Sequence, residues 1–420
     1  MDAPFRVQRH PSFPRGSILP ADWSRNTPVM VPLLFALLAA DTLPRPTAPP
    51  AASVIVHRQP ALPVVALRLS LLADDPPGYA GVGHLIQHLM QPRLEQEVER
   101  VGGHAQMERN ADALIYTISG PASELGYLAG VLRSALELPR FSDTELLVAK
   151  HALAEERLAE WETASGHVRA TLRATLFPDD LPAAGTDAAA ERWEMAALPA
   201  AWAAMYRSER VSVVAVGDVS PAAVEAAFSS LPHPPAAPPL AVSADTVPLT
   251  PLAPAEATRG WLGIGYAASS ADPATLTITA RLLQNQLARQ LPTATVEVEH
   301  WWTHHGQALT LVVAAPENAL AGARRALSGA IGTLRRELDA RRVRDASASV
   351  RRDLLFFSRT PTNMASLLGS FADRSGDANA AQAFYVALDK VRPEDVEALL
   401  TELATRTPAR ADLPPQKLSK

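Results

Sequence analysis

His84 and His88 stand four residues apart, with Leu-Ile-Gln between them. On an α-helix, residues at this spacing share one face with their Cβ atoms about 5–6 Å apart, which lets two imidazoles bind one zinc ion. Such a pair also arises often by chance, so by itself it is a weak indication of a metal site. Because the chain has no cysteine, any metal must bind to His, Asp or Glu, and thiolate zinc sites, Fe–S clusters and disulfides are excluded.

A second histidine-rich segment, His-Trp-Trp-Thr-His-His at 300–305, follows Glu297 and Glu299. Three interpretations are open for it: a second metal site, an aromatic peptide-binding patch, or the end of a strand whose tryptophans pack on a neighbouring helix. The third is favoured, because large aromatic side chains are more often part of a core than of a binding site.

The sequence around the first histidine pair, Gly-Val-Gly-His-Leu-Ile-Gln-His-Leu-Met at 81–90, extends the pattern. It resembles the inverted zinc motif H-x-x-E-H of the insulinase/pitrilysin peptidase family, which includes the mitochondrial processing peptidase and small bacterial two-domain relatives. The likeness continues in Gly102-Gly103, in Ala-Leu-Ala-Glu-Glu at 152–156, and in the strand and Gly-Asp turn at 213–218. With 263–266 and 391–396 in the second half, it covers roughly residues 53–403.

The resemblance implies a set of site residues. Its zinc ligands would be His84, His88 and Glu156. Gln106, where family members usually carry Asn, and Arg289, in the helix that holds the family's substrate-binding arginine, would contact the substrate. Zinc is therefore the expected cofactor, and an unfolded peptide is the expected substrate.

The sequence also departs from the family at a decisive position. Gln87 stands where the family's glutamate acts as the general base, and an amide cannot accept a proton near neutral pH. The second half, moreover, has no tyrosine between Tyr266 and Tyr385, where the family places a substrate-binding tyrosine. We therefore expect hydrolysis to be lost or severely reduced.

These features predict an insulinase/processing-peptidase-like chain that is catalytically inactive or weak. Small members of the family work in pairs that close a chamber around a peptide, so we expect a homo- or heterodimer with a related, active zinc metallopeptidase chain. Two alternatives stay open. One is a zinc-free structural scaffold subunit, and the other is an active zinc metalloendopeptidase whose base is Glu155 or a residue of the partner.

The elements that must position these residues follow from periodicity. Alternating apolar residues predict strands at 65–71 and 114–119, and helical spacing predicts helices at 82–90, 94–101 and 143–162, the last carrying Glu156. Gln91-Pro92 is expected to separate the first two helices.

The order strand, helix, strand, long helices occurs twice, before and after a stretch with eight prolines between Pro232 and Pro254. We predict an α+β fold of two related halves, each a mostly antiparallel sheet with helices packed on one face. The predicted divisions are an N-terminal extension at 1–52, a first peptidase-like domain at 53–231, a linker at 232–258, a second domain at 259–410 and a tail at 411–420.

Charge and hydropathy limit the remaining function classes. With 39 basic and 44 acidic residues and no long basic block, the chain is a poor match for a nucleic-acid-binding protein. The apolar run at 29–40 is too short to span a membrane, which takes about 20 residues. It has the length of a signal-peptide h-region, which would make the protein periplasmic or secreted. If it is instead an extension that packs on the body, a cytoplasmic location is expected.

Overall fold

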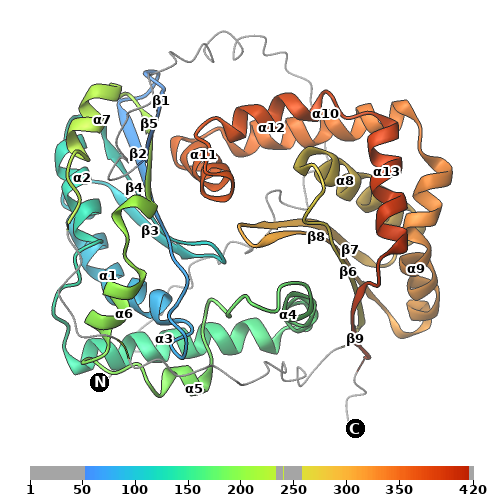
Figure 1. The fold of residues 1–420 in the computed structure, drawn as a ribbon, viewed down its shortest axis with the longest axis horizontal. Helices are drawn as coiled ribbons and strands as arrows, with labels where there is room; N and C mark the ends of the chain where they lie inside the picture. Colours follow the sequence, from blue (N-terminus) through green and yellow to red (C-terminus); the bar gives the residue numbers. More distant parts are fainter. Residues whose placement is uncertain (1–52, 233–239, 241–257, 416–420) are drawn as a thin grey trace, which may run out of the picture.

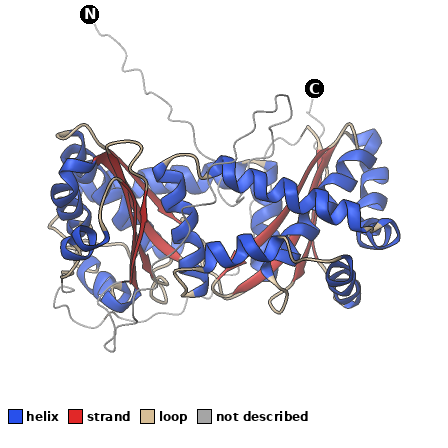
Figure 2. Cartoon of the chain, turned by 90° about the horizontal axis from the view of Figure 1, so that it is seen from above, coloured by secondary structure: helices blue, strands red, loops and turns tan. Residues whose placement is uncertain are grey.

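The computed structural model describes residues 53–232, 240 and 258–415. The predicted extension at 1–52, with its apolar run, most of the predicted linker and the last five residues lie outside this part. Within it, two β-sheets face each other across the molecule, and most helices lie on their outer faces (Figures 1 and 2). No helix in the described ranges is long and apolar enough to cross a membrane.

The first sheet has the strand order β1-β5-β2-β4-β3. β1 runs parallel to β5, and the other neighbours are antiparallel. β3 is an edge strand, and the turn that joins it to β4 contains Asp112. The strands are β1 (Ser53–Arg58), β2 (Val64–Leu72), β3 (His104–Arg109), β4 (Ala113–Pro121) and β5 (Val211–Gly217).

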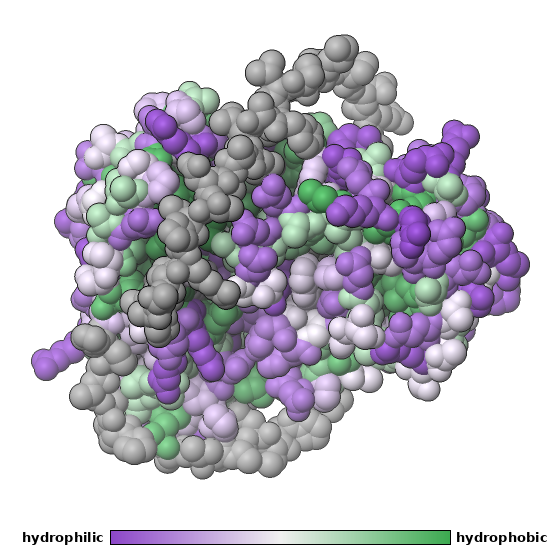
Figure 3. All heavy atoms as spheres, turned by 45° about the horizontal axis from the view of Figure 1, so that its top comes forward, coloured by the Kyte–Doolittle hydropathy of each residue, from purple (hydrophilic) through white to green (hydrophobic). Residues whose placement is uncertain are grey.

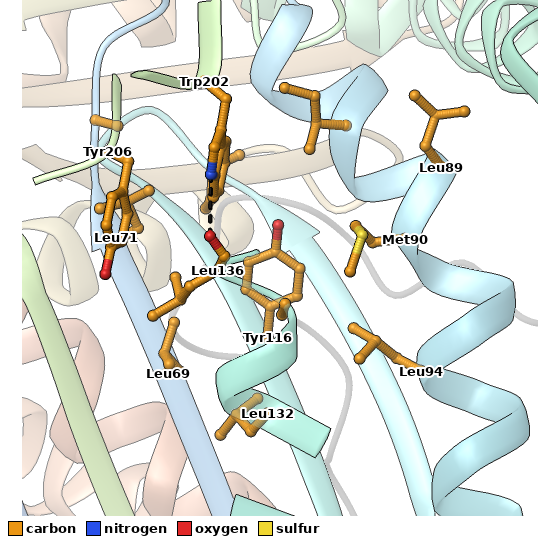
Figure 4. Packing of buried hydrophobic residues seen from close by; sticks show 14 of the residues in the cluster. Leu69, Leu71, Leu89, Met90, Leu94, Tyr116, Leu132, Leu136, Trp202 and Tyr206 are labelled. Atoms are coloured by element: carbon orange, nitrogen blue, oxygen red, sulfur yellow. Dashed lines mark hydrogen bonds between the residues drawn. The ribbon is translucent and has the colours of Figure 1, made fainter. Parts of the chain in front are cut away.

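Helices of the first half cover one face of this sheet. They bury the alternate residues of β2, Leu67, Leu69 and Leu71, and the indole Nε1 of Trp202 donates to the Leu136 carbonyl at 3.0 Å inside this core (Figure 4). The helices of this half are α1 (Val82–Glu99), α2 (Leu125–Ser134), α3 (Asp143–Glu162), α4 (Ala164–Leu176), α5 (Asp187–Ala190), α6 (Leu198–Met205) and α7 (Pro221–Ala227), with 3₁₀ turns η2 (Ala122–Glu124) and η3 (Ser208–Arg210).

The prediction of two helices at 82–90 and 94–101 is wrong, because α1 runs unbroken through Pro92. Leu89 and Met90 before the proline and Leu94 after it are buried in the same core (Figure 4). Burial of large apolar side chains on both sides, each worth about 1.5–3 kcal/mol, outweighs the loss of one hydrogen bond at the proline.

The second half repeats this plan with the strand order β7-β8-β6-β9, and all its neighbouring strands are antiparallel. Its strands are β6 (Gly260–Ala267), β7 (Thr295–Thr303), β8 (Gly306–Ala315) and β9 (Ala409–Leu413). Its helices are α8 (Pro273–Gln290), α9 (Leu320–Glu337), α10 (Ala340–Phe357), α11 (Pro361–Ser375), α12 (Ala380–Leu388) and α13 (Pro393–Thr405), with the 3₁₀ turn η4 (Glu317–Ala319).

The predicted end of the second domain at 410 falls inside β9. This strand alternates buried Ala409, Ala411 and Leu413 with exposed residues and pairs with β6. Two of its three buried residues are alanines, which give a weak hydrophobic signal, so the sequence did not reveal the strand.

In addition, one helix of each half packs on the sheet of the other half. α4 of the first half packs on β6 and β9, and α11 of the second half packs on β2 and β5. A Cβ at Gly263 of β6 would lie 2.6 Å from Val168 Cγ1 of α4, so glycine is needed for this close approach. The prediction of two α+β halves is confirmed, and the structure adds a helix from the opposite half on the second face of each sheet.

The surface mixes hydrophilic and hydrophobic residues on the face seen in Figure 3. Three of the exposed large hydrophobic residues, Leu147, Val148 and Leu158, lie on α3, the first two being 68% and 64% exposed. They lie on the helix that carries Glu156.

Candidate metal centre

Residues that precede the histidines in the chain fix the position of the first turn of α1. The Asp75 carboxylate accepts hydrogen bonds from the backbone N–H groups of Gly81, at 2.7 Å, and Gly83, at 3.0 Å. Gly81 has φ +85°, and a Cβ there would lie 2.6 Å from the Gly185 Cα. Only glycine meets both requirements at little cost, so the first turn of α1 has one well-defined position.

α1 then places His84 and His88 on one face, with their ring centroids 4.8 Å apart. α3 packs beside α1 and brings Glu156 to both rings. Its two carboxylate oxygens lie 3.5 Å from His84 Nε2 and 3.4 Å from His88 Nε2. The structure therefore brings together the three residues that the sequence singled out, from two helices that β3, β4 and α2 separate in the chain.

This donor set fits a zinc ion. Two imidazole nitrogens and one carboxylate are a common three-ligand set for zinc, and they leave a fourth position open. Ligands at 2.0–2.1 Å in a tetrahedron are about 3.3 Å apart, close to the separations between Glu156 and the rings. His84 is buried, whereas His88 and Glu156 are half-buried, so solvent reaches part of the group.

Gln87 lies between the histidines and is buried, with 2% of its surface exposed. Its Nε2 donates to the backbone carbonyls of Glu108, at 3.0 Å, and Ile115, at 3.1 Å. These carbonyls belong to opposite residues of β3 and β4. The amide therefore joins α1 to the sheet, and this environment calls for a donor, which a carboxylate cannot supply.

Glu155, the alternative base, lies elsewhere. It is 72% exposed, and its carboxylate lies 3.7 Å from the His151 Nε2 on the outer face of α3. No metal-ligating group in the described part of the chain includes it. The geometry therefore gives Glu155 no role beside the histidine pair.

The two predicted substrate contacts lie in different places. Gln106 is exposed on the edge strand β3, two residues before Glu108. Arg289 is exposed in the last turn of α8, a helix that packs against β7, α9 and α10. No described contact joins Arg289 to the metal-ligating groups, so only Gln106 lies on an element that touches the candidate centre.

The second histidine-rich segment divides into two parts. His300 in β7 is held by Thr277 and Gln307, each at 2.9 Å, and burial lowers the pKa of His300 to about 3. This neutral, enclosed ring agrees with the favoured interpretation of a packed strand. His304 and His305 instead leave the strand and meet Asp74 of the first half. Sequence reasoning did not find Asp74, because no motif or spacing connects it with this segment.

Comparisons with known proteins bear on the fold. No protein-family model matches the sequence, and no curated protein matches it. Among solved structures, an M16-like peptidase from Alicyclobacillus acidocaldarius has a TM-score of 0.67 at 14% identity, covering 83% of this chain and 92% of that one. The inactive domain of a peptidase M16 from Pseudomonas fluorescens gives 0.70 at 14% identity, covering 88% and 97%.

The fold is that of M16-like peptidases. A chain of complex III from Candida albicans shares it too, with a TM-score of 0.71, 12% identity, and coverage of 86% of this chain and 93% of that one. The predicted resemblance to insulinase-like peptidases is thus confirmed at the level of the M16-like fold. Identities of 12–14% show a shared fold alone.

Proposed function

We propose that this chain is a peptide-binding M16-like subunit that holds zinc at His84, His88 and Glu156 but is catalytically inactive or weak, and that it pairs with an active, related metallopeptidase chain. The observation that carries the proposal is the Gln87 amide, bound to two carbonyls of the sheet while the ligand group beside it is complete. Zinc held there would act as a Lewis acid toward a peptide carbonyl.

The chain's own residues fit binding better than cleavage. β3 is an edge strand, so the described part of the chain offers an open row of backbone groups to an extended peptide. Gln106 is exposed on this strand. Gln87 cannot take a proton from water, and Glu155 pairs with His151 away from the metal-ligating group, so neither of these two residues is placed to act as the base.

Pairing with a related chain has one supporting feature. Leu147 and Val148 lie on the outer face of α3 as large exposed apolar side chains, which is typical of a surface that a partner covers. The alternative of a scaffold without zinc draws support from the inactive M16 domain and from the complex III chain, whose folds are equally close.

The experiment measures zinc, mass and activity on one preparation made without chelator. We expect His84→Ala to lose one equivalent of zinc relative to the unmodified chain, while the exposed His151→Ala variant loses none. An unfolded peptide should bind without chelator-sensitive cleavage. Equal zinc contents in all three proteins would favour the scaffold, and cleavage by the unmodified chain would overturn the inactive-subunit proposal.

The same preparation tests pairing by light scattering at micromolar concentration. We expect the mass of a dimer, either of this chain or with an added related peptidase chain, and a shift to monomer in Leu147→Asp/Val148→Asp. A monomer in every mixture would remove the pairing from the proposal and leave the zinc result untouched.

A further inference from the structure

The turn between β7 and β8 consists of His304 and His305, since Thr303 pairs directly with Gly306. Two-residue hairpin loops favour Asn-Gly, Asp-Gly or Gly-rich pairs because of the backbone angles that they need. Two adjacent histidines are not explained by turn formation. Such departures from local preference are expected where a residue serves a function.

The hairpin tip belongs to the second half, but its neighbours come from the first half. His304 Nε2 lies 3.7 Å from Asp74 Oδ1, and His305 Nε2 lies 3.6 Å from the same oxygen. Asp74 follows β2 by two residues and immediately precedes Asp75, which holds the start of α1. Two imidazoles and a carboxylate thus meet where the halves touch.

Asp112 fixes the orientation of one ring. Its Oδ1 accepts hydrogen bonds from the backbone N–H of His304, at 2.9 Å, and lies 2.7 Å from His304 Nδ1. The Asp112 side chain is 4% exposed, and Arg374 lies 3.9 Å from its other oxygen. With Nδ1 paired to a carboxylate, His304 presents Nε2 to Asp74, which is the carboxylate–histidine arrangement that supports metal-binding imidazoles.

Asp180 provides a further oxygen on the other side. Its Oδ2 accepts from Arg173 at 2.5 Å, whereas its Oδ1 is buried and has no hydrogen-bond partner among the described residues. This Oδ1 lies 3.6 Å from His305 Nε2, and the side chain is 4% exposed. A buried carboxylate oxygen without a donor is costly, and a cation beside it would remove that cost.

We propose that Asp74, His304 and His305, with Asp180 as the nearest further oxygen, form a second divalent-metal site that joins the β7–β8 hairpin to the first half. Neutral nitrogen and carboxylate donors suit zinc. The Asp74 and Asp180 oxygens lie 3.6–3.7 Å from the imidazole nitrogens they face, close to the roughly 3.3 Å between ligands of a tetrahedral zinc site. Asp74 is 60% exposed, and the two rings are about one-third exposed, so an ion can enter from solvent.

The proposal does not depend on the His84 centre, since the two groups share no residue. Its structural effect would be to attach the hairpin of the second half to the loop that leads into α1. Zinc at this site would therefore restrict motion between the halves near the candidate metal centre.

The test is a titration of metal-free full-length protein with zinc alone, followed by calorimetry and elemental analysis. We expect two equivalents in the unmodified chain and in His151→Ala, one in His304→Ala/His305→Ala, and one in His84→Ala. Asp112→Asn should keep the fold and weaken the second site by about 10–100-fold. The tip residues are exposed, so their substitution should not prevent folding.

Amide hydrogen exchange shows which segment of the chain zinc binding protects. Zinc should protect the β7–β8 hairpin at 295–315 in the unmodified chain and in His84→Ala, but not in His304→Ala/His305→Ala. Unchanged stoichiometry in the hairpin variant, or no zinc-dependent protection of the hairpin, would overturn this proposal. Loss of zinc only in His84→Ala would also overturn this proposal, while supporting the first centre. Loss of zinc only in His304→Ala/His305→Ala would support this proposal and refute the first centre.

Discussion

Gln87 shows how a single amide can change the use of a metal-ligating helix. Its Nε2 satisfies two carbonyl groups of β3 and β4, in a position where a carboxylate would face the oxygens of both. An ionised side chain buried among acceptors costs several kcal/mol unless it turns away or binds a proton. The residue therefore serves the packing of α1, and its amide is not a group that can take a proton from water.

We predict that Gln87→Glu destabilises the metal-free protein by about 1–3 kcal/mol, since two buried carbonyls lose their donor. Urea unfolding at neutral pH measures this change. The matched substitution Gln106→Glu, on an exposed side chain of β3, should alter the midpoint little. We also expect little or no peptidase activity from unpaired Gln87→Glu, because a base without substrate-positioning groups is insufficient.

Robust, chelator-sensitive cleavage by unpaired Gln87→Glu would show that the second half positions a peptide better than its sequence indicates. Unchanged stability would show that the two carbonyls find other donors.

The ligands of the candidate metal centre could be predicted from motifs, but the surroundings of these ligands could not. His84 and His88 lie on one predicted helix, and the resemblance supplied Glu156, which the structure brings to both rings. The hydrogen bonds of Gln87 could not be predicted from the sequence. Its acceptors are backbone carbonyls of β3 and β4, and every residue type has such a carbonyl. Asp74 was missed for a related reason: it meets the hairpin tip only through folding.

At the scale of elements, the exchanged helices explain several errors of prediction. The alternation of apolar and other residues at 65–71 is typical of a strand with one buried face, yet Arg68 and Ser70 on its second face are also buried, under α11. α11 itself was not predicted, because its sequence carries glycine and several polar residues that contact the opposite sheet. β3 was also missed, since its exposed and polar residues obscure the alternation. Of β7, only the end was expected, in the segment at 300–305.

The contact between α4 and β6 gives a test of this arrangement. Gly263→Ala would place a Cβ 2.6 Å from Val168 Cγ1 and 3.0 Å from Leu172 Cδ1, so α4 must shift. We expect a loss of about 1–3 kcal/mol in the free energy of unfolding, typical of overpacking in a core. Thermal and urea unfolding measure it.

Gly329→Ala is the matched control. It lies within α9, and an added Cβ there meets nothing within 4 Å. Alanine in a helix interior is favoured over glycine by about 0.5–1 kcal/mol, so this variant should be stabilised. A Gly263→Ala protein as stable as the Gly329→Ala protein would mean that α4 does not pack on β6 as described.

At the scale of the whole molecule, the two halves share a buried ion pair. Arg68 Nη2 of β2 donates to Asp373 Oδ2 of α11 at 2.7 Å, and both side chains are at most 3% exposed. Ser70 and Ser212 donate to the other oxygen of Asp373 at 2.6 and 3.2 Å. The carboxylate therefore has acceptor contacts with two strands of the first half and ties α11 to them.

We predict that Asp373→Ala lowers stability by about 3–5 kcal/mol, because it leaves the buried Arg68 guanidinium without its partner. Calorimetry should show a lower transition temperature, and limited proteolysis should cut α11 sooner. Asp345→Ala, which removes an exposed ion pair with Arg341, should leave the transition nearly unchanged. Equal behaviour of the two variants would mean that α11 is held by apolar contacts alone.

The exchange of α4 and α11 has a consequence for how the chain can be divided. A half expressed alone would expose one face of its own sheet and carry a long helix with no surface to cover, so neither piece is a self-sufficient folding unit. A nick between residues 232 and 258 should therefore leave a non-covalent complex that migrates as one species, and the two pieces, made separately, should complement each other only when refolded together. The covalent connection between the halves then contributes little to their association. They are held together because α4 and α11 each pack on the sheet of the opposite half.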